Sequence, residues 1–346
     1  DFLADLTHRG LRAPLLGTDI IGELPGRQDR RILLRADIDA LPIMEESGKP
    51  YASRIPGMMH ACGHDAHATM LVGAALVLNE LREHLPVHVR FVWQPGEENA
   101  CGGEKLVAKG AAEGCEAAFA MHGWPGLALG KVSAMPGPFF AAADFFTITV
   151  RGRGGHAALP ERAASPIPGA ARVILALQEL HQKLNRQCGA VVTVAQMAAG
   201  HASNIIPETV TLIGTTRFLD PSFGAQVKSG MEAALATALA GESSEIKAEL
   251  DYRSTYRLPV INDERMVGEL RRAASTIGPD AWEEATKPTM GAEDFAFFLE
   301  HRPGAMFWLG LGNCPGLHNP HFDFNDEALA EGIMMHCQVA LNYAST

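Results

Sequence analysis

Short apolar segments that alternate with helical segments most limit how this chain can fold. Residues 15–43 read as two apolar strands around a Pro-Gly turn, and residues 68–81 as a helix that is apolar all round and therefore buried. Residues 86–98 and 117–126 read as strands that end in turns. This alternation predicts an α/β fold, with a mostly parallel sheet and helices on both faces. Active groups of such sheets sit beyond the carboxyl ends of the strands.

The pattern changes near residue 144. Residues 144–155 alternate polar and apolar side chains, as a half-exposed antiparallel strand does, and 166–184 form an amphipathic helix. The segments that follow complete the order β-α-β-β-α-β, which is the ferredoxin-like order. We therefore expect an inserted α+β domain at 144–257, and a first domain made of 1–143 and 258–346.

Composition excludes several classes of function. A chain of 346 residues is too long for one ordinary core, and its net charge of −11 argues against nucleic acid or an anionic membrane as a partner. No apolar run reaches the roughly 20 residues of a membrane helix. The six cysteines are scattered, which favours free thiols in a reducing, cytoplasmic compartment. The chain opens without Met or a signal-peptide pattern, so we expect a further N-terminal piece.

The segment "MMHACGHDAH" at 58–67 concentrates possible metal ligands. Cys62 and His64, two residues apart, can converge on one ion from a loop. Thiolate and imidazole both suit Zn²⁺, and imidazole also suits Mn²⁺, Co²⁺ or Ni²⁺. The alternative is a buried Cys in a tight turn beside surface histidines, and this motif alone does not decide between the two.

A second cluster, "QPGEENACGG", places Glu97 and Glu98 just past an apolar strand. Consecutive side chains there point in different directions, so one can bind a metal while the other carries protons. His122 follows another strand, and His318 and His321 lie near the C-terminus. Each could be a structural residue, and an isolated Glu-Glu pair is usually a solvated loop. Four such loops in one α/β domain favour a site with two metals and mixed ligands.

These residues belong to a longer series of motifs. In chain order they are "RADIDALP", "MHACGHDAHATMLVGAA", "QPGEE", "MHGWP", "GRGGHAALP", "SNIIP", "GTTRFLD", "MGAEDFAFF" and "LHNPHFDFND". The series resembles the M20 metallopeptidases over nearly the whole chain, and most of all their amidohydrolase branch (subfamily D). That branch includes N-acyl-amino-acid deacylases, hippurate hydrolases and auxin-conjugate hydrolases. The resemblance implies a Zn-peptidase-like catalytic domain.

The resemblance also implies roles for individual residues. Cys62 would bridge two metal ions, and His64, Glu98, His122 and His318 would complete the ligand set. Glu97 would be the general base, and Asp39 a supporting carboxylate. His60, His67 and His321 are expected to be supporting or structural residues.

The inserted domain would be the family's lid and dimerisation domain. His156 would reach the active site of the partner subunit in a homodimer (a tetramer is also possible) and polarise the scissile carbonyl. Asn204 and Arg217 match positions that contact the substrate carboxylate or backbone. Glu161 and Ser165 depart from the residues usual in this loop, which puts lid details and substrate preference in doubt. Cys101, close to the expected site, is either a redox-sensitive thiol or passive.

The sequence thus predicts an enzyme that hydrolyses the amide bond of N-acyl-amino acids with two divalent metal ions per subunit. One alternative is a dipeptidase or carboxypeptidase of the same family. Another is a non-catalytic protein that binds metal or an amino-acid conjugate. The intact pair of Glu97 and Glu98 argues against a pure binder, which has no need of an unligated base.

Overall fold

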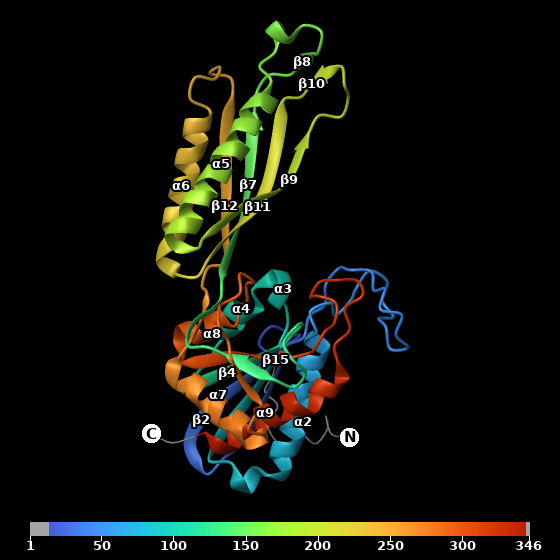
Figure 1. Ribbon diagram of the computed structural model, residues 1–346, viewed down its shortest axis with the longest axis vertical. Helices are drawn as coiled ribbons and strands as arrows, with labels where there is room; N and C mark the ends of the chain where they lie inside the picture. Colours follow the sequence, from blue (N-terminus) through green and yellow to red (C-terminus); the bar gives the residue numbers. More distant parts are fainter. Residues whose placement is uncertain (1–13, 344–346) are drawn as a thin grey trace. The chain divides into compact units, whose positions relative to one another are not determined.

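The computed structural model describes residues 14–343, which divide into two compact units (Figure 1). Unit 1 takes in the described residues up to Phe139, then Val260–Pro288, then those from Glu293 onward. Unit 2 takes in Phe140–Pro259 and Thr289–Ala292. No helix among the described residues is long and apolar enough to span a membrane.

Unit 1 is built on a seven-stranded sheet with the order β1-β3-β2-β4-β15-β5-β14. Four of its neighbouring pairs are parallel (β3 with β2, β2 with β4, β4 with β15, β5 with β14), and the pairs β1–β3 and β15–β5 are antiparallel. The mostly parallel sheet predicted from the sequence is confirmed. The strands are β1 (Ile20–Leu24), β2 (Gln28–Asp37), β3 (Val87–Gln94), β4 (Ala117–Trp124), β5 (Val132–Ala134), β14 (Trp282–Glu284) and β15 (Gly304–Gly310).

The helices of unit 1 form two sets. Helices α2 and α7 both pack against α9, and α4 packs against α8; in Figure 1 the strands of unit 1 lie between the two sets. The helices are α2 (His64–Glu80), α3 (Glu97–Ala100), α4 (Gly102–Ala108), α7 (Glu264–Ile277), α8 (Ala296–His301) and α9 (Leu329–Asn342), with 3₁₀ turns at Arg82–His84 and Asp326–Ala328. A short pair of strands, β6 (Gly137–Phe140) and β13 (Val260–Asn262), forms a separate sheet.

The central strands are continuous apolar runs because both of their faces are covered. Ile32, Leu33 and Leu34 of β2 are fully buried. Helix α2 differs from the expectation of burial on all sides. Its Val72 and Leu76 are exposed, because the helix packs inward along one side only.

Unit 2 has the β-α-β-β-α-β order expected from the sequence. Its four-stranded antiparallel sheet has the order β12-β7-β11-β9, and the buried side chains of α5 and α6 join those of the strands in one apolar core. Ser165 caps α5 by accepting a hydrogen bond from the amide of Ile167, and Gly189 ends it in the left-handed conformation. The elements are β7 (Ala142–Arg151), β8 (Gly155–His156), α5 (Pro166–Cys188), β9 (Val191–Ala199), β10 (Ile205–Ile206), β11 (Thr209–Phe218), α6 (Gly224–Ala238) and β12 (Lys247–Tyr256), with 3₁₀ turns at Pro160–Arg162 and Pro221–Phe223.

Candidate active site

The five side chains expected to be metal ligands lie together at one edge of the unit 1 sheet. His122 is in β4, Glu98 follows β3, and His318 is in the loop after β15. Cys62 and His64 come from the segment that follows β2 and opens α2. Because β3, β2, β4 and β15 are parallel neighbours, their carboxyl ends meet at this edge, where ligands of α/β sheets bind.

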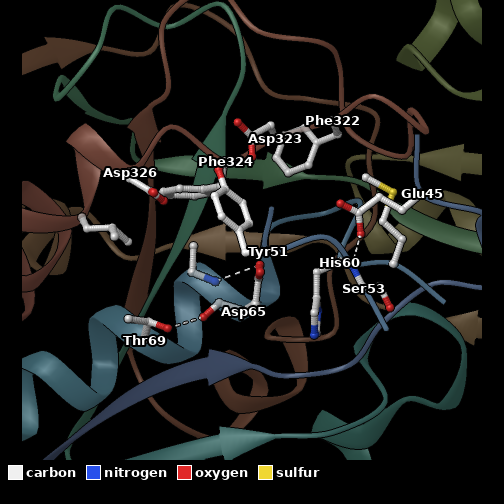
Figure 2. A pocket seen from close by; sticks show the side chains of 13 residues that line it. Glu45, Tyr51, Ser53, His60, Asp65, Thr69, Phe322, Asp323, Phe324 and Asp326 are labelled. Atoms are coloured by element: carbon white, nitrogen blue, oxygen red, sulfur yellow. Dashed lines mark hydrogen bonds between the residues drawn. The ribbon is translucent and has the colours of Figure 1, made fainter. Parts of the chain in front are cut away.

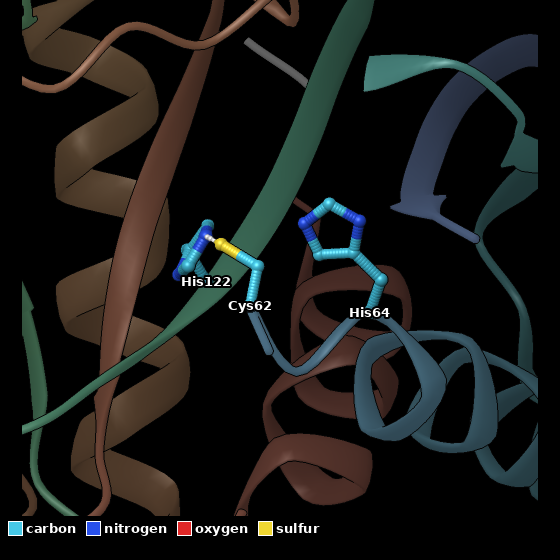
Figure 3. A group of neighbouring side chains, drawn as sticks. All are labelled: Cys62, His64 and His122. Carbon is cyan, nitrogen blue, oxygen red and sulfur yellow. Dashed lines mark hydrogen bonds between the residues drawn. The ribbon is translucent and has the colours of Figure 1, made fainter. Parts of the chain in front are cut away.

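The ligand atoms form two overlapping groups. Those of Cys62, His64 and His122 lie within 4.8 Å of one another, and so do those of Cys62, Glu98 and His318. The Cys62 Sγ is 3.4 Å from the His122 Nε2, and Figure 3 shows the first group. Cys62 belongs to both groups, and a set of thiolate, imidazole and carboxylate donors suits divalent transition metals.

Two buried atoms of these groups have no hydrogen-bond partner among the described residues. They are the Nε2 of His64 and the Oε1 of Glu98. The Glu98 Oε1 lies 3.2 Å from the Nε2 of His318 and 3.9 Å from that of His64. A buried polar atom without a partner costs about 1–3 kcal/mol. Atoms of this kind, converging from separate segments, fit a bound cation.

Left-handed backbone conformations occur at two positions in the segments that carry the candidate ligands. Gly63, between Cys62 and His64, has φ 81°, and a Cβ there would lie 2.9 Å from a ring carbon of Phe324. His318 also adopts a left-handed conformation, with φ 63°, although it is not glycine. Its amide donates to the carbonyl of Ala61 at 2.7 Å, which ties it to the cysteine-bearing loop. Strain of this kind persists where the surrounding structure enforces it.

Asp39 joins the two sequence clusters. Its carboxylate accepts hydrogen bonds from the amides of Glu97 and Glu98, both at 3.0 Å, and lies 3.3 Å from the Nδ1 of His64. Burial opposes its charged form, but these donors hold the pKa of Asp39 below its usual value. With Nδ1 facing Asp39, the His64 ring directs Nε2 toward the ligand atoms, as supporting carboxylates commonly arrange for metal-binding histidines.

The surroundings act on the protonation of the candidate ligands. Burial, and then the charge of Glu98, raise the pKa of the Cys62 thiol well above its usual value. Burial lowers the pKa of His122 to about 3, so this imidazole is neutral. For His64, burial is outweighed mainly by Asp37, and its pKa rises to about 9. A bound cation would favour the thiolate and the neutral imidazole, since those are the forms that coordinate.

Glu97 is buried beside Glu98. Its carboxylate lies within 4.8 Å of ligand atoms of His64 and Glu98, and within the same distance of the carboxylates of Glu293 and Asp294. Burial and then these three acidic neighbours raise the pKa of Glu97 well above its usual value. A carboxyl group that holds a proton readily in this position suits proton transfer.

One buried cation close to Glu97, the guanidinium of Arg35, was not predicted from the sequence. Arg35, fully buried in β2, contacts Asp37 at 2.8 Å and Glu293, Asp294 and the Gln94 side chain at 3.0 Å each. The available signal was a charged residue near the end of the apolar run "RRILLRAD". A buried charge is rare unless it is paired.

The three remaining histidines of the sequence motifs are not in the two ligand groups that share Cys62. The Nδ1 of His60 lies 3.2 Å from the carbonyl oxygen of Asp39, and that of His321 lies 2.8 Å from the carbonyl oxygen of Glu46. His67 is buried against Asp37. Cys101 is also buried, and burial raises the pKa of its thiol to about 11, which does not favour a redox-sensitive thiolate. All six cysteines are free.

The candidate substrate residues lie in unit 2, at two different places. His156 in β8 pairs with Ile205 of β10, and the amide of Ala157 donates to the carbonyl of Asn204 at 3.0 Å, so His156 and Asn204 are neighbours. Arg217 lies at the opposite end of β11 from that pairing. About 26 Å of strand separates Thr209 from Arg217, at roughly 3.3 Å per residue.

A pocket of about 310 Å³ opens beside the segment that carries Cys62 and His64 (Figure 2). It is bordered by His60 and Asp65, which flank Cys62 and His64 in the sequence, but none of the five candidate ligands lines it. Its wall also carries Glu45, Tyr51, Ser53, Met59, Ala66, Thr69, Phe322, Asp323, Phe324, Asp326 and Leu329.

Comparison with known proteins places this arrangement in a family. The model of peptidase family M20/M25/M40 matches residues 33–342. An N-acetylcysteine deacetylase of Bacillus subtilis is 34% identical over 334 residues, covering 96% of this chain and 86% of that protein. IAA-amino acid hydrolase ILR1-like 4 of Arabidopsis thaliana is 35% identical over 350 residues, covering 98% of this chain and 79% of that protein.

A solved structure agrees. A Bacillus subtilis protein described as a dinuclear metal-binding peptidase of family M20 superposes with a TM-score of 0.83 at 33% identity, covering 96% of this chain and 87% of that one. A match over most of the chain, together with these relatives, is decisive. The chain therefore belongs to peptidase family M20/M25/M40 and is a metal-dependent amidohydrolase of that family.

Proposed function

We propose that this enzyme hydrolyses the amide bond of N-acyl-amino acids and releases the free amino acid and a carboxylic acid. The observation that carries the proposal is the place of Cys62 in two groups of ligand atoms at once. The relatives named above for deacetylating N-acetylcysteine and hydrolysing an indoleacetyl conjugate support this substrate class.

Two divalent ions would share Cys62. One would be held with His64 and His122, and the other with Glu98 and His318. Zn²⁺ is the expected ion because thiolate and imidazole favour it, while Mn²⁺, Co²⁺ and Ni²⁺ would also bind such donors. The free cysteines support a reducing, cytoplasmic location.

Glu97 would be the general base. When bound, the ions would lower the pKa of a water molecule and polarise the acyl carbonyl. Glu97 then takes the proton of the attacking water and returns it to the departing amine. Asp39 would hold the backbone of both glutamates in place, since its carboxylate accepts from both of their amides.

The residues of unit 2 would bind and polarise the substrate in a homodimer. The Nδ1 of His156 accepts a hydrogen bond from the amide of Ala158, which leaves the ring proton on Nε2. An exposed Nε2–H can donate to the oxyanion in the partner's site. Arg217 is half-buried and has no ion pair with any residue of 14–343. Its guanidinium is therefore free to bind the substrate carboxylate bidentately.

The test begins with two neighbouring variants. Glu97→Gln should keep its metal while turnover of an N-acetyl or N-benzoyl amino acid falls by roughly 10² or more. Glu98→Gln, the matched control, should lose metal as well as activity. Exchange of these two results would reverse the roles of the glutamates. Cleavage of dipeptides alone would indicate the peptidase, and no turnover by the metal-loaded enzyme on any of the three substrate types would indicate a binding protein.

Subunit mixing tests the roles assigned to unit 2. A heterodimer of His156→Ala and Glu97→Ala subunits should recover activity, because one of its two sites holds both intact residues. Mixing Arg217→Ala with Glu97→Ala should give no recovery, because Arg217, at the opposite end of β11 from His156, is expected to act in its own subunit. Absence of recovery with His156→Ala would rule out the shared site.

A further inference from the structure

His67 has no role in the mechanism above, although it is buried beside the ligands. It lies in the first turns of α2 with 1% of its surface exposed. Its Nδ1 lies 2.7 Å from the carboxylate of Asp37, and its Nε2 lies 2.9 Å from the backbone amide of Gly123. Both ring nitrogens are therefore engaged.

These two partners fix the protonation of the ring. The Gly123 amide can only donate, so the His67 Nε2 must carry a lone pair. The carboxylate of Asp37 can only accept when it is ionised, so the proton is on Nδ1. Asp37 is ionised because its other oxygen is paired with the fully buried guanidinium of Arg35 at 2.8 Å. His67 is thus a neutral imidazole with no lone pair left for a cation.

The backbone of Gly123 connects His67 to the candidate ligand His122. The carbonyl oxygen of Gly123 accepts from the Nδ1 of His122 at 2.8 Å. This bond puts the ring proton of His122 on Nδ1 and leaves a lone pair on Nε2, the atom that lies 3.4 Å from the Cys62 Sγ. His67 holds one end of this residue's backbone and His122 bonds to the other.

Gly123 has little freedom to move on its own. A Cβ at this position would lie 2.5 Å from a ring carbon of Phe324 and 3.2 Å from a methyl carbon of Leu311. The backbone is packed closely against both side chains, and its buried amide donates to the Nε2 of His67. Without that acceptor the amide would be a buried donor with no partner.

We propose that His67 is a positioning residue that sets the His122 ring for metal binding through the backbone of Gly123, and is not a metal ligand itself. The inference rests on the proposed metal site. It assigns Arg35, Asp37, His67 and Gly123 to one chain of contacts that ends at His122. Removing a supporting contact of this kind lowers metal affinity about 10- to 100-fold.

The test compares replacements of His67 in the full chain. His67→Phe removes both contacts. His67→Gln offers an acceptor oxygen toward Gly123, and His67→Asn offers a donor toward Asp37. Zn²⁺ affinity, measured by competition with a chromophoric chelator, should fall 10- to 100-fold in His67→Phe. It should recover most in His67→Gln, because that variant restores the contact to Gly123. At saturating Zn²⁺ the stoichiometry should stay at two ions per subunit.

The matched control is His336→Phe. His336 is also fully buried, and neither of its ring nitrogens has a hydrogen-bond partner among the described residues, so its removal should leave Zn²⁺ affinity unchanged. Thermal unfolding of the metal-free variants separates a general loss of folding from a specific loss of affinity.

Three results would overturn the inference. Loss of one ion at saturation in His67→Gln would make His67 a ligand. Affinity within twofold of the parent in His67→Phe would remove its positioning role. Better recovery by His67→Asn than by His67→Gln would mean that the contact to Asp37, and not the one to Gly123, matters. Failure of the proposed function is distinct, because the parent enzyme itself would then bind no ions or cleave no N-acyl-amino acid.

Discussion

Two clusters of polar and ionisable side chains lie side by side in unit 1, and all of their members except His318 are largely buried. The arginine cluster comprises Arg35, Asp37, Gln94, Glu293 and Asp294. The ligand cluster comprises Cys62, His64, Glu98, His122 and His318. In the arginine cluster every carboxylate has a donor: Arg35 contacts all three, and the Asp294 oxygens also accept from the Gln94 side chain and from the amide of Gly103.

The ligand cluster has no permanently charged cation such as Arg35, and its only positive charge without metal is a protonated imidazole such as His64. Among the described residues, the His64 Nε2 and the Glu98 Oε1 are buried without hydrogen-bond partners. The comparison shows that a set of buried donor atoms favours a metal ion where the chain provides no permanently charged partner for them. The carboxylate of Glu97 lies within 4.8 Å of groups in both clusters.

The largest effect is expected on removing the internal cation. Arg35→Met should destabilise the metal-free protein by about 3–5 kcal/mol, because it leaves three buried carboxylates without their partner. Urea unfolding measures the change. Arg30→Met is the control: its pair with Glu116 is partly exposed, and about 0–1 kcal/mol should be lost. Equal losses in the two variants would contradict the comparison.

A buried imidazole outside both clusters should show a somewhat smaller effect that depends on pH. Burial lowers the pKa of His336 from 6.5 to about 4. Below pH 6.5 the unfolded chain takes up this proton before the folded one does, so stability falls as the pH drops from about 6.5 to about 4. The loss amounts to roughly 3 kcal/mol. His336→Phe should flatten this part of the stability profile, and a profile parallel to that of the parent would disprove the assignment.

His336 also sharpens the comparison. It carries two unpartnered nitrogens, yet it is not in any of the groups of possible metal ligands among the described residues. Its ring lies 6.1 Å from that of Phe307. A buried polar atom without a hydrogen-bond partner therefore indicates a metal site only where several possible ligand atoms lie close together.

The smallest effect is expected in the ligand cluster without metal. In the presence of a chelator, Glu98→Gln should change the free energy of unfolding by about 1 kcal/mol or less, because the Glu98 Oε1 has no hydrogen-bond partner among the described residues and its contact with His318 is partly exposed. With Zn²⁺ present, the parent should be stabilised relative to the variant, since binding to the folded state adds to stability. A loss above about 2 kcal/mol in the metal-free variant would mean that Glu98 is a structural carboxylate.

Much of the ligand cluster follows from the amino-acid sequence. Cys62, Glu98 and His122 each sit near the end of an apolar strand or in a short motif, and the parallel order predicts that such ends meet. The β-α-β-β-α-β order of residues 144–257 is equally visible, because helix and strand periods are local properties of the chain. The role of each residue in the ligand cluster, His318 included, was assigned only through the resemblance of the chain to a family.

The arginine cluster could not be inferred in this way. Arg35 meets Glu293 and Asp294 across 258 and 259 positions of sequence, and Gln94 across 59. Nothing near Arg35 in the chain tells which acids will face it. Likewise, the place of Arg217 at the far end of β11 from His156 follows from antiparallel register and not from their spacing.

Local periodicity and short motifs are enough to predict the kind of fold and the loops that carry possible metal ligands. Three features could be seen only in the folded structure. Cys62 belongs to two groups of possible ligands, and Arg35 pairs with the acidic side chains close to Glu97. Both ring nitrogens of His67 are hydrogen-bonded. These features depend on strand order and on side-chain directions within a few Å, which are set by packing between segments that are distant in the chain.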